Sequence, residues 1–170
     1  MNTEQAKFLV ETLSGNLERE FQTTCKVLAA VKDDTKGYKP DEKSRTAWEL
    51  ATHLATSDVW FLDSIINGAF KSDPEAAKQA ESQFQSVNDV VAFYKQALPA
   101  KIAELRALPG DKLTRDVDFF GMMKAPAASF LPLMSNHSIH HRGQLAAYLR
   151  PMGSKVPAIY GGSADEPMNG

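Results

Sequence analysis

Apolar residues recur at steps of three and four along four long stretches of the chain, the spacing that places side chains on one face of an α-helix. These stretches cover residues 3–32, 47–67, 87–108 and 126–149. The connections between them are polar or contain proline and glycine, and no strand pattern of comparable length interrupts them. Four long helices predict an all-α fold, a four-helix bundle. Because several connections are long, a bundle with long crossovers fits as well as simple up-down-up-down order.

Local signals predict where these helices begin and end. Thr46 and Glu49 stand at the spacing of a capping box, so the second helix is expected to start directly after the threonine. Gly68 follows the last position of that helix and is a suitable stop. Pro126 suits the first turn of the fourth helix, and Pro132 predicts an irregularity farther along it.

The remaining segments are shorter or irregular. Residues 69–85 are mostly polar with a central proline, and they predict at most a short helix. Residues 111–125 carry apolar side chains around a glycine and predict an apolar loop or a short extended piece that packs onto the bundle. We therefore expect one bundle domain over residues 1–153 and an irregular tail over residues 154–170, packed on the bundle or on a partner subunit.

Composition and charge narrow the classes of function. A length of 170 residues suits one domain, and a net charge of −2 with interspersed signs lacks the basic stripe that binding to nucleic acid requires. No feature favours a membrane either, because no apolar run is long enough to span a bilayer. The N-terminal sequence does not resemble a signal peptide, and Cys25 is the only cysteine. A disulfide framework is therefore excluded, and a cytoplasmic location is expected.

Three of the four histidines cluster in the predicted fourth helix and offer metal-ligand chemistry. His137 and His141 are four residues apart, which places two imidazoles on one helix face, a common way to bind a transition metal. One helix cannot surround an ion, so a third ligand must come from another helix, and His53 is the remaining histidine. The competing interpretation is that His53 is a hydrogen-bonded core residue. His140 and Gln144 lie near the same face and are expected to contact a ligand rather than the ion.

The sequence does not assign a catalytic acid or base. The His-Glu-x-x-His motif of zinc proteases is absent because Ser138 occupies the glutamate position, which argues against an ordinary metalloprotease. Asp58 is predicted to be a solvated or capping acid, and Trp60 is predicted to be a core residue. Arg142 points away from the histidine face and is expected to pair with a carboxylate at a packing contact. The catalytic residues therefore stay unassigned.

The run His137-Ser-Ile-His-His-Arg-Gly-Gln144, with a histidine early in the second helix, resembles the DinB-like superfamily of metalloproteins, which is distinct from the DNA polymerase of the same name. The segment Phe119-Phe-Gly121 ahead of the fourth helix and the tail over residues 156–166 also resemble family members. The resemblance implies a four-helix bundle of the DinB/YfiT type, commonly a homodimer, with a metal ion held by three histidines. Carried over position by position, those ligands are His53, His137 and His141.

Such a site predicts a metal-dependent enzyme with an open coordination position. Three neutral imidazoles suit zinc or nickel, with iron and copper also compatible, and three protein ligands leave room for water or a thiolate. Characterised members of the resembled family include transferases of low-molecular-weight thiols, a thiol-dependent isomerase and proposed metal-dependent hydrolases. We therefore expect either a thiol-cofactor S-transferase or a hydrolase of a small substrate. The alternatives are a non-catalytic, metal-stabilised or stress-associated dimer and a metal-free helical interaction module.

Overall fold

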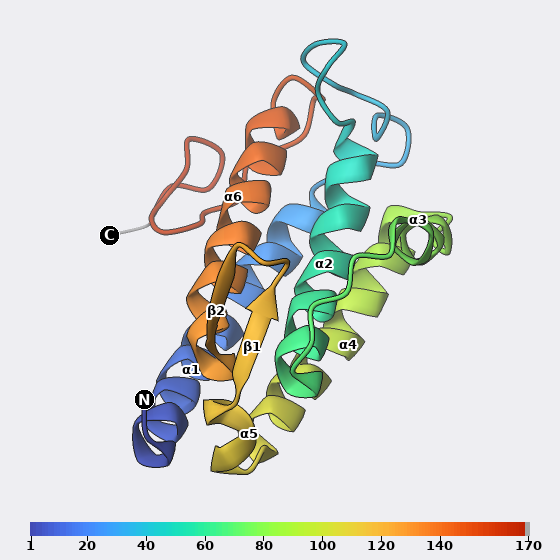
Figure 1. The fold of residues 1–170 in the computed structure, drawn as a ribbon. Helices are drawn as coiled ribbons and strands as arrows, with labels where there is room; N and C mark the ends of the chain where they lie inside the picture. Colours follow the sequence, from blue (N-terminus) through green and yellow to red (C-terminus); the bar gives the residue numbers. More distant parts are fainter. Residues whose placement is uncertain (169–170) are drawn as a thin grey trace.

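The computed structural model describes residues 1–168, and its centre is a bundle of four long helices (Figure 1). These are α1 (Thr3–Ala29), α2 (Ala47–Asn67), α4 (Val87–Ala107) and α6 (Leu131–Leu149). Helices α1 and α2 each pack against both α4 and α6, so α1 and α2 lie diagonally opposite each other around one core. The predicted all-α four-helix bundle is confirmed.

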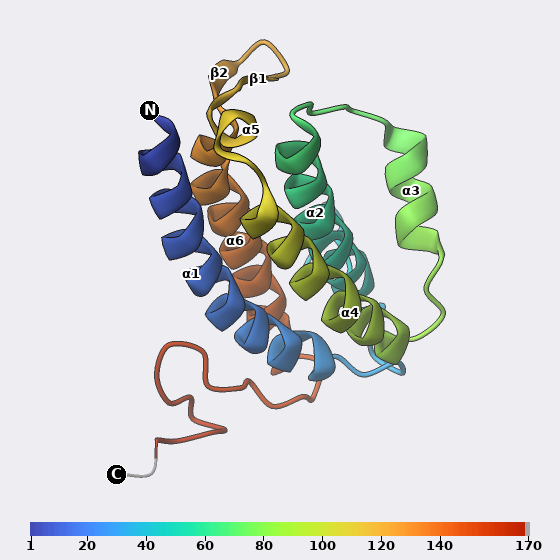
Figure 2. The ribbon, with the colours of Figure 1, turned by 90° about the horizontal axis from the view of Figure 1, so that it is seen from below.

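Shorter elements occupy the connections between the long helices. Helix α3 (Pro74–Ser82) lies in the predicted polar connection and stands apart at the outer side of the bundle, next to α2 (Figure 2). Helix α5 (Gly110–Thr114) leads into an antiparallel hairpin of β1 (Asp116–Phe119) and β2 (Met123–Pro126), followed by the short 3-10 helix η1 (Ala127–Phe130). The predicted short helix and the predicted extended piece are both present, and the extended piece is a hairpin.

The ends of α2 lie where the sequence predicts them. The Thr46 hydroxyl accepts a hydrogen bond from the backbone N–H of Glu49 over 3.1 Å, and the Glu49 carboxylate accepts one from the N–H of Thr46 over 2.7 Å. At the other end Gly68 has a φ of 71°, a left-handed conformation that favours glycine. A side chain at Gly68 would also collide with Arg115, whose guanidinium donates to the Ile65 carbonyl of the last turn over 3.1 Å. Helix α2 is therefore fixed at both ends.

Helix α6 starts later than the sequence predicts. Pro126 is the last residue of β2 and pairs with Asp116 in the hairpin, so the prediction that it opens the helix is wrong. The chain then passes through η1, and α6 begins at Leu131. The predicted irregularity at Pro132 is wrong as well, because Pro132 lies in the first turn, where its missing N–H is not needed. Both prolines suit a helix start, but Pro126 pairs within the hairpin, so Pro132 is the proline that lies in the first turn of α6.

The core is apolar where the four long helices meet. Each of them contributes fully enclosed leucines, among them Leu28, Leu54, Leu98 and Leu145. Beyond α6 the described residues form no helix or strand, and the Tyr160 hydroxyl contacts the bundle through Glu20 of α1 and Arg142 of α6. None of the helices within residues 1–168 combines the length and apolar character that crossing a bilayer requires.

Candidate metal centre

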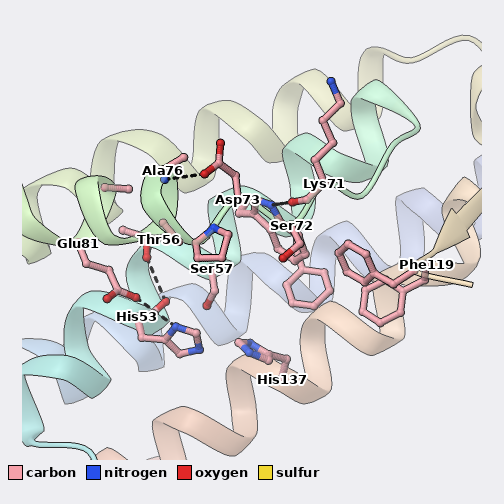
Figure 3. A pocket seen from close by; sticks show the side chains of 16 residues that line it. His53, Thr56, Ser57, Lys71, Ser72, Asp73, Ala76, Glu81, Phe119 and His137 are labelled. Atoms are coloured by element: carbon pink, nitrogen blue, oxygen red, sulfur yellow. Dashed lines mark hydrogen bonds and ion pairs between the residues drawn. The ribbon is translucent and has the colours of Figure 1, made fainter. Parts of the chain in front are cut away.

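Three imidazole rings converge where α2 packs against α6. His53 comes from the first half of α2, and His137 and His141 come from successive turns of α6. The centre of the His53 ring lies 5.3 Å from that of His137 and 4.8 Å from that of His141, and the two α6 rings are 4.5 Å apart. One ring nitrogen from each residue lies within 4.8 Å of the other two. Figure 3 shows the rings of His53 and His137 side by side, projecting from different helices. The structure thus brings together the three histidines that the sequence predicts as ligands.

His140 and Gln144, which the sequence predicts near a ligand, take different positions. His140 is exposed, and its ring meets that of His141 at 5.0 Å between ring centres without joining the cluster. The side-chain oxygen of Gln144 lies 2.8 Å from Nδ1 of His141. A carbonyl oxygen only accepts hydrogen bonds, so this nitrogen carries the proton and Nε2 keeps the lone pair that a metal ion needs. Gln144 therefore orients one of the candidate ligands.

Helix α3 supplies a partner that sequence reasoning missed. Glu81 places a carboxylate oxygen 3.3 Å from Nδ1 of His53, which holds the ring and leaves its Nε2 available. Nδ1 of His137 is buried and has no hydrogen-bond partner among the described residues. No sequence signal identifies Glu81, because it lies in a polar connection whose approach to α2 depends on the loops at both of its ends.

Burial keeps the three imidazoles neutral. Desolvation is the largest cause that lowers the pKa of His53 from 6.5 to about 3, and the positive charge of Arg45 and the two neighbouring histidines also contribute to this shift. Desolvation is also the largest cause that lowers the pKa of His137 to about 4 and shifts the pKa of His141 downward. A metal ion binds the neutral form of imidazole, so all three rings are ready to coordinate near neutral pH.

A cavity of about 500 Å³ opens beside His53 and His137 (Figure 3). Residues of α2 and α3 line it, and the β1–β2 hairpin contributes two phenylalanines. Most of its surface is apolar, and the apolar lining residues are Trp60, Phe61, Pro74, Ala76, Ala77, Ala80, Phe119 and Phe120. Two of the polar lining residues are already engaged. The Thr56 hydroxyl donates to a backbone carbonyl of α2 over 2.9 Å, and the Asp73 carboxylate accepts from a backbone N–H at the start of α3 over 2.9 Å.

The cavity exists because the α3 residues that line it, apart from Pro74 and Glu81, are alanines with small side chains. None of the residues of α3, Pro74–Ser82, is buried, and the side that lines the cavity carries alanines. Trp60, predicted as a core residue, is instead only half-buried at the cavity wall, and its Nε1 donates to the Lys71 carbonyl over 3.3 Å. Leucine-sized side chains at the alanine positions would fill this space, as large side chains fill the contact between α2 and α4.

Asp58 lies in the bundle core, where α2 meets α4 and α6. It is fully buried and accepts hydrogen bonds from the Tyr94 hydroxyl over 2.7 Å and from the Ser138 hydroxyl over 2.8 Å. The prediction of a solvated or capping acid is wrong, because the neighbouring helices enclose this position. Burial raises the pKa of Asp58 from 3.8 to about 7, although both hydroxyls act to lower it. A usable signal was present in the sequence, since Asp58 stands four residues after Leu54, on the apolar face of α2.

Arg142 fixes α6 against α1 directly beside the candidate ligands. Its side chain is 1% exposed and forms an ion pair with Glu20 of α1. It also donates to the Thr24 hydroxyl over 3.3 Å and to the Tyr160 hydroxyl of the tail. The predicted pairing of Arg142 with a carboxylate at a packing contact is confirmed. Because Arg142 follows His141 in the chain, this network also restrains the position of the two α6 histidines.

The chain matches known proteins along most of its length. The sequence profile of the DinB family matches residues 1–168. YjoA of Bacillus subtilis strain 168, an uncharacterised protein, is 32% identical over 133 residues, which cover 76% of this chain and 82% of YjoA. The crystal structure of YjoA, a DinB-like protein, aligns at 28% identity with a TM-score of 0.67 over 85% of this chain and 93% of that one.

Two further solved structures share the fold. A DinB-like protein from Bacillus cereus ATCC 10987 aligns with a TM-score of 0.73 at 24% identity, over 88% of this chain and 97% of that one. YfiT from Bacillus subtilis, described as a probable metal-dependent hydrolase with an unusual four-helix bundle topology, aligns with a TM-score of 0.65 at 16% identity over 91% of each chain. The family match over residues 1–168 and the shared bundle lead to one conclusion: this protein belongs to the DinB family.

Proposed function

We propose that this protein is a metal-dependent enzyme that acts on small molecules, with a hydrolase as the first candidate. Its metal is a divalent transition ion, zinc or nickel, held by His53, His137 and His141. The observation that carries the proposal is the convergence of three neutral imidazoles, with ring nitrogens within 4.8 Å of one another, beside a cavity of about 500 Å³. The description of YfiT, which shares this fold, as a probable metal-dependent hydrolase supports the same class here.

The donor set fits such an ion. Three nitrogen donors suit zinc or nickel, and three protein ligands are typical of catalytic rather than structural zinc sites. Glu81 and Gln144 each hold the Nδ1 of one histidine, as the outer partners of metal-binding histidines do. When bound, the ion supplies Lewis acidity, which lowers the pKa of water and polarises a substrate oxygen. The adjoining cavity offers room for a substrate, which favours an enzyme over a bundle that is only stabilised by metal.

We assign proton transfer to Glu81, in addition to its contact with His53. Its carboxylate lines the cavity, and burial raises its pKa above the usual value, which makes it a better proton acceptor near neutral pH. The other carboxylate of the cavity, Asp73, is engaged in capping α3. The hydroxyls of Thr56 and Ser57 donate to backbone carbonyls of α2 rather than to a base, so neither is an activated nucleophile.

A thiol-cofactor S-transferase is the second candidate, and Arg45 is the observation that favours it. The positive charge of Arg45 contributes to lowering the pKa of all three histidines, so its guanidinium lies near the site. Several low-molecular-weight thiols, glutathione among them, carry carboxylates, which a guanidinium binds well. The two candidates therefore differ in the nucleophile that is activated, which is water in the hydrolase and a thiolate in the transferase.

Protein purified without a histidine tag tests the proposal. Elemental analysis is expected to find about one zinc or nickel ion per chain. The loaded protein is then screened with p-nitrophenyl esters and anilides, and separately with electrophiles in the presence of small thiols. The activity that is found should disappear in His141→Ala and persist in His140→Ala, whose ring is exposed. Absence of tightly bound metal, or activity that survives in His141→Ala, would contradict the proposal, and tight metal binding with every screen blank would favour the non-catalytic alternative.

A further inference from the structure

The turn of the β1–β2 hairpin holds an aromatic residue in an unfavourable backbone conformation. The Met122 N–H donates to the Phe119 carbonyl over 3.0 Å, and the two central residues, Phe120 and Gly121, have φ values of 55° and 72°. A two-residue turn of this kind favours asparagine, aspartate or glycine, because a larger side chain at positive φ crowds the backbone. Within the described part of the chain, Phe120 is the one residue other than glycine with a positive φ.

Burial does not account for a phenylalanine in this turn. The Phe120 side chain is 41% exposed, so folding gains only part of its hydrophobic stabilisation. Its ring lines the cavity and lies parallel to the Trp60 indole, at an interplanar angle of 3° and 6.5 Å between ring centres. The hydrogen bond from Nε1 of Trp60 to the Lys71 carbonyl fixes the orientation of that indole. The ring also packs near Phe119 and Phe70, but it remains partly exposed, and a strained backbone at a cavity-lining residue is characteristic of ligand-binding positions.

The aromatic pair Trp60 and Phe120 is connected to the candidate metal ligands through one further ring. Phe61 lies 4.9 Å from Trp60 and 5.1 Å from His137, measured between ring centres. The same cavity is lined by the aromatic pair and by His53 and His137. A small molecule with a ring against the aromatic pair therefore extends its other end into the part of the cavity that the histidines line.

The alanines of α3 give the cavity an apolar wall of small side chains. Helix α3 lines the cavity with Ala76, Ala77 and Ala80, which carry only methyl groups. A planar ring in this cavity therefore meets methyl groups of α3 as well as the aromatic side chains of Trp60 and Phe120. Aromatic rings bind to such surfaces through stacking as well as through burial of apolar area.

We propose that Trp60 and Phe120 bind a flat apolar group of the substrate, such as an aromatic ring, and thereby select amphipathic small molecules whose polar end reaches the three histidines. The reaction at the polar end rests on the proposed function, whereas the binding of the ring rests on the aromatic pair alone. The strained turn is explained by this role, because it holds the Phe120 ring at the cavity.

Binding of 2-naphthalenemethanol, which has a flat ring and no strong metal-binding group, tests this proposal. Titration calorimetry on the purified protein is expected to show saturable binding. Phe120→Asn suits a positive φ and removes the ring, so it should weaken binding at least about fivefold while the thermal midpoint stays equal or rises. Met122→Asn is the matched control, since Met122 belongs to the same turn, is 73% exposed and is not among the cavity-lining residues. Its affinity for the probe should equal that of the wild type.

Binding that does not saturate, or an affinity that Phe120→Asn leaves unchanged or Met122→Asn lowers equally, would overturn the proposal. Trp60→Leu provides a second test on the other member of the pair and should weaken binding to a similar extent. Elemental analysis of the same samples reports on the proposed function separately. Probe binding without tightly bound metal would contradict the metal-dependent function but still support the aromatic site. Bound metal without probe binding would support the metal-dependent function and contradict the aromatic site.

Discussion

Helix α2 has a closed side, facing α4, and an open side, facing α3, and the neighbouring helix decides the difference. On the closed side α4 fills the space with large side chains such as Tyr94 and Leu98, which are 1% and 2% exposed. On the open side α3 presents alanines, and Trp60 lines a cavity of about 500 Å³. Helix α2 supplies large and polar residues to both sides, so the position of the cavity is set by the small side chains of α3.

The two sides of α2 also differ in the titratable group that each of them buries, Asp58 on the closed side and His53 on the open side. On the closed side Asp58 is enclosed, and its Oδ1 has no hydrogen-bond partner within residues 1–168. On the open side His53 borders the cavity, where burial lowers its pKa to about 3. Burial favours the neutral form of both groups. Ionisation of Asp58 inside the core therefore costs free energy. The neutral imidazole of His53, by contrast, has a lone pair available for a metal ion.

The largest expected effect concerns the closed side and the free energy of unfolding of metal-free protein. The pKa of Asp58 in the folded state, about 7, lies above its ordinary value of 3.8, so the folded state binds this proton more tightly than the unfolded state. The stability that results is fully present below pH 3.8 and is lost as the pH rises to about 7, by on the order of 4 kcal/mol. Asp58→Asn should remove this loss.

Urea unfolding of the wild type and of Asp58→Asn between about pH 4 and pH 8 measures this effect. The difference in unfolding free energy should shift in favour of the variant as the pH rises, and should level off above about pH 7. The histidines, whose lowered pKa values act in the opposite direction, are present in both proteins and cancel in the difference. A difference that stays constant over this range would show that Asp58 is ionised throughout.

The next largest effect concerns the ligands on the open side. His53→Ala and His141→Ala should each lower zinc affinity by more than about 100-fold. Mutation of a residue that only hydrogen-bonds to a metal ligand costs up to about 100-fold, so loss of a ligand itself should cost more. His140→Ala should stay within about twofold of the wild type, because its exposed ring lies outside the cluster. Chelator competition measures all three affinities. An unchanged affinity in His53→Ala would mean that His53 is not a ligand and that only the two histidines of α6 bind the ion.

The features that could be predicted from the sequence depend on local rules. The start of α2 follows from the hydrogen bonds between Thr46 and Glu49, and its end follows from the left-handed conformation at Gly68. The pairing of His137 with His141 follows from helical spacing. In each case the determining contacts lie within a few residues of one another, so a single stretch of sequence contains them.

The features that could not be predicted depend on the approach of distant segments. The position of Asp58 on the apolar face of α2 could be read from the sequence, but its hydrogen bond with Tyr94 of α4 depends on a residue 36 positions away in the chain. Glu81 reaches His53 across 28 residues, through loops whose course no pattern specifies. Pro126 pairs across the hairpin rather than opening a helix. The cavity could not be predicted either, because alanines in a polar helix do not indicate which segment packs against them.

A smaller effect is expected when the contact between α3 and His53 is weakened. Glu81→Gln keeps the shape of the side chain but removes its charge, so it should lower zinc affinity by roughly tenfold. Glu75→Gln, on the exposed first turn of the same helix and away from the cavity, is the control and should leave the affinity unchanged. Equal affinities of Glu81→Gln and the wild type would mean that α3 closes the cavity without orienting the ligand.

The smallest effect is expected for a side chain added on the open side, compared with the same side chain added inside the core. Ala77→Leu places a larger side chain in the cavity and should change the free energy of unfolding by less than about 0.5 kcal/mol. Ala55→Leu places it in α2 at a position with 0% exposure, and overpacking there should destabilise the protein by about 1–3 kcal/mol. Urea unfolding compares the two variants. Equal destabilisation would show that α3 packs as tightly as the core.

In the proposed site, imidazoles from α2 and α6 hold one ion and leave a coordination position free. X-ray absorption at the zinc edge of tag-free, zinc-loaded protein tests this arrangement by counting the ligands. Three imidazole nitrogens at about 2.0–2.1 Å, together with an oxygen ligand from solvent, are expected. A spectrum with fewer than three imidazoles, with sulfur as a ligand, or unchanged in His53→Ala would contradict it.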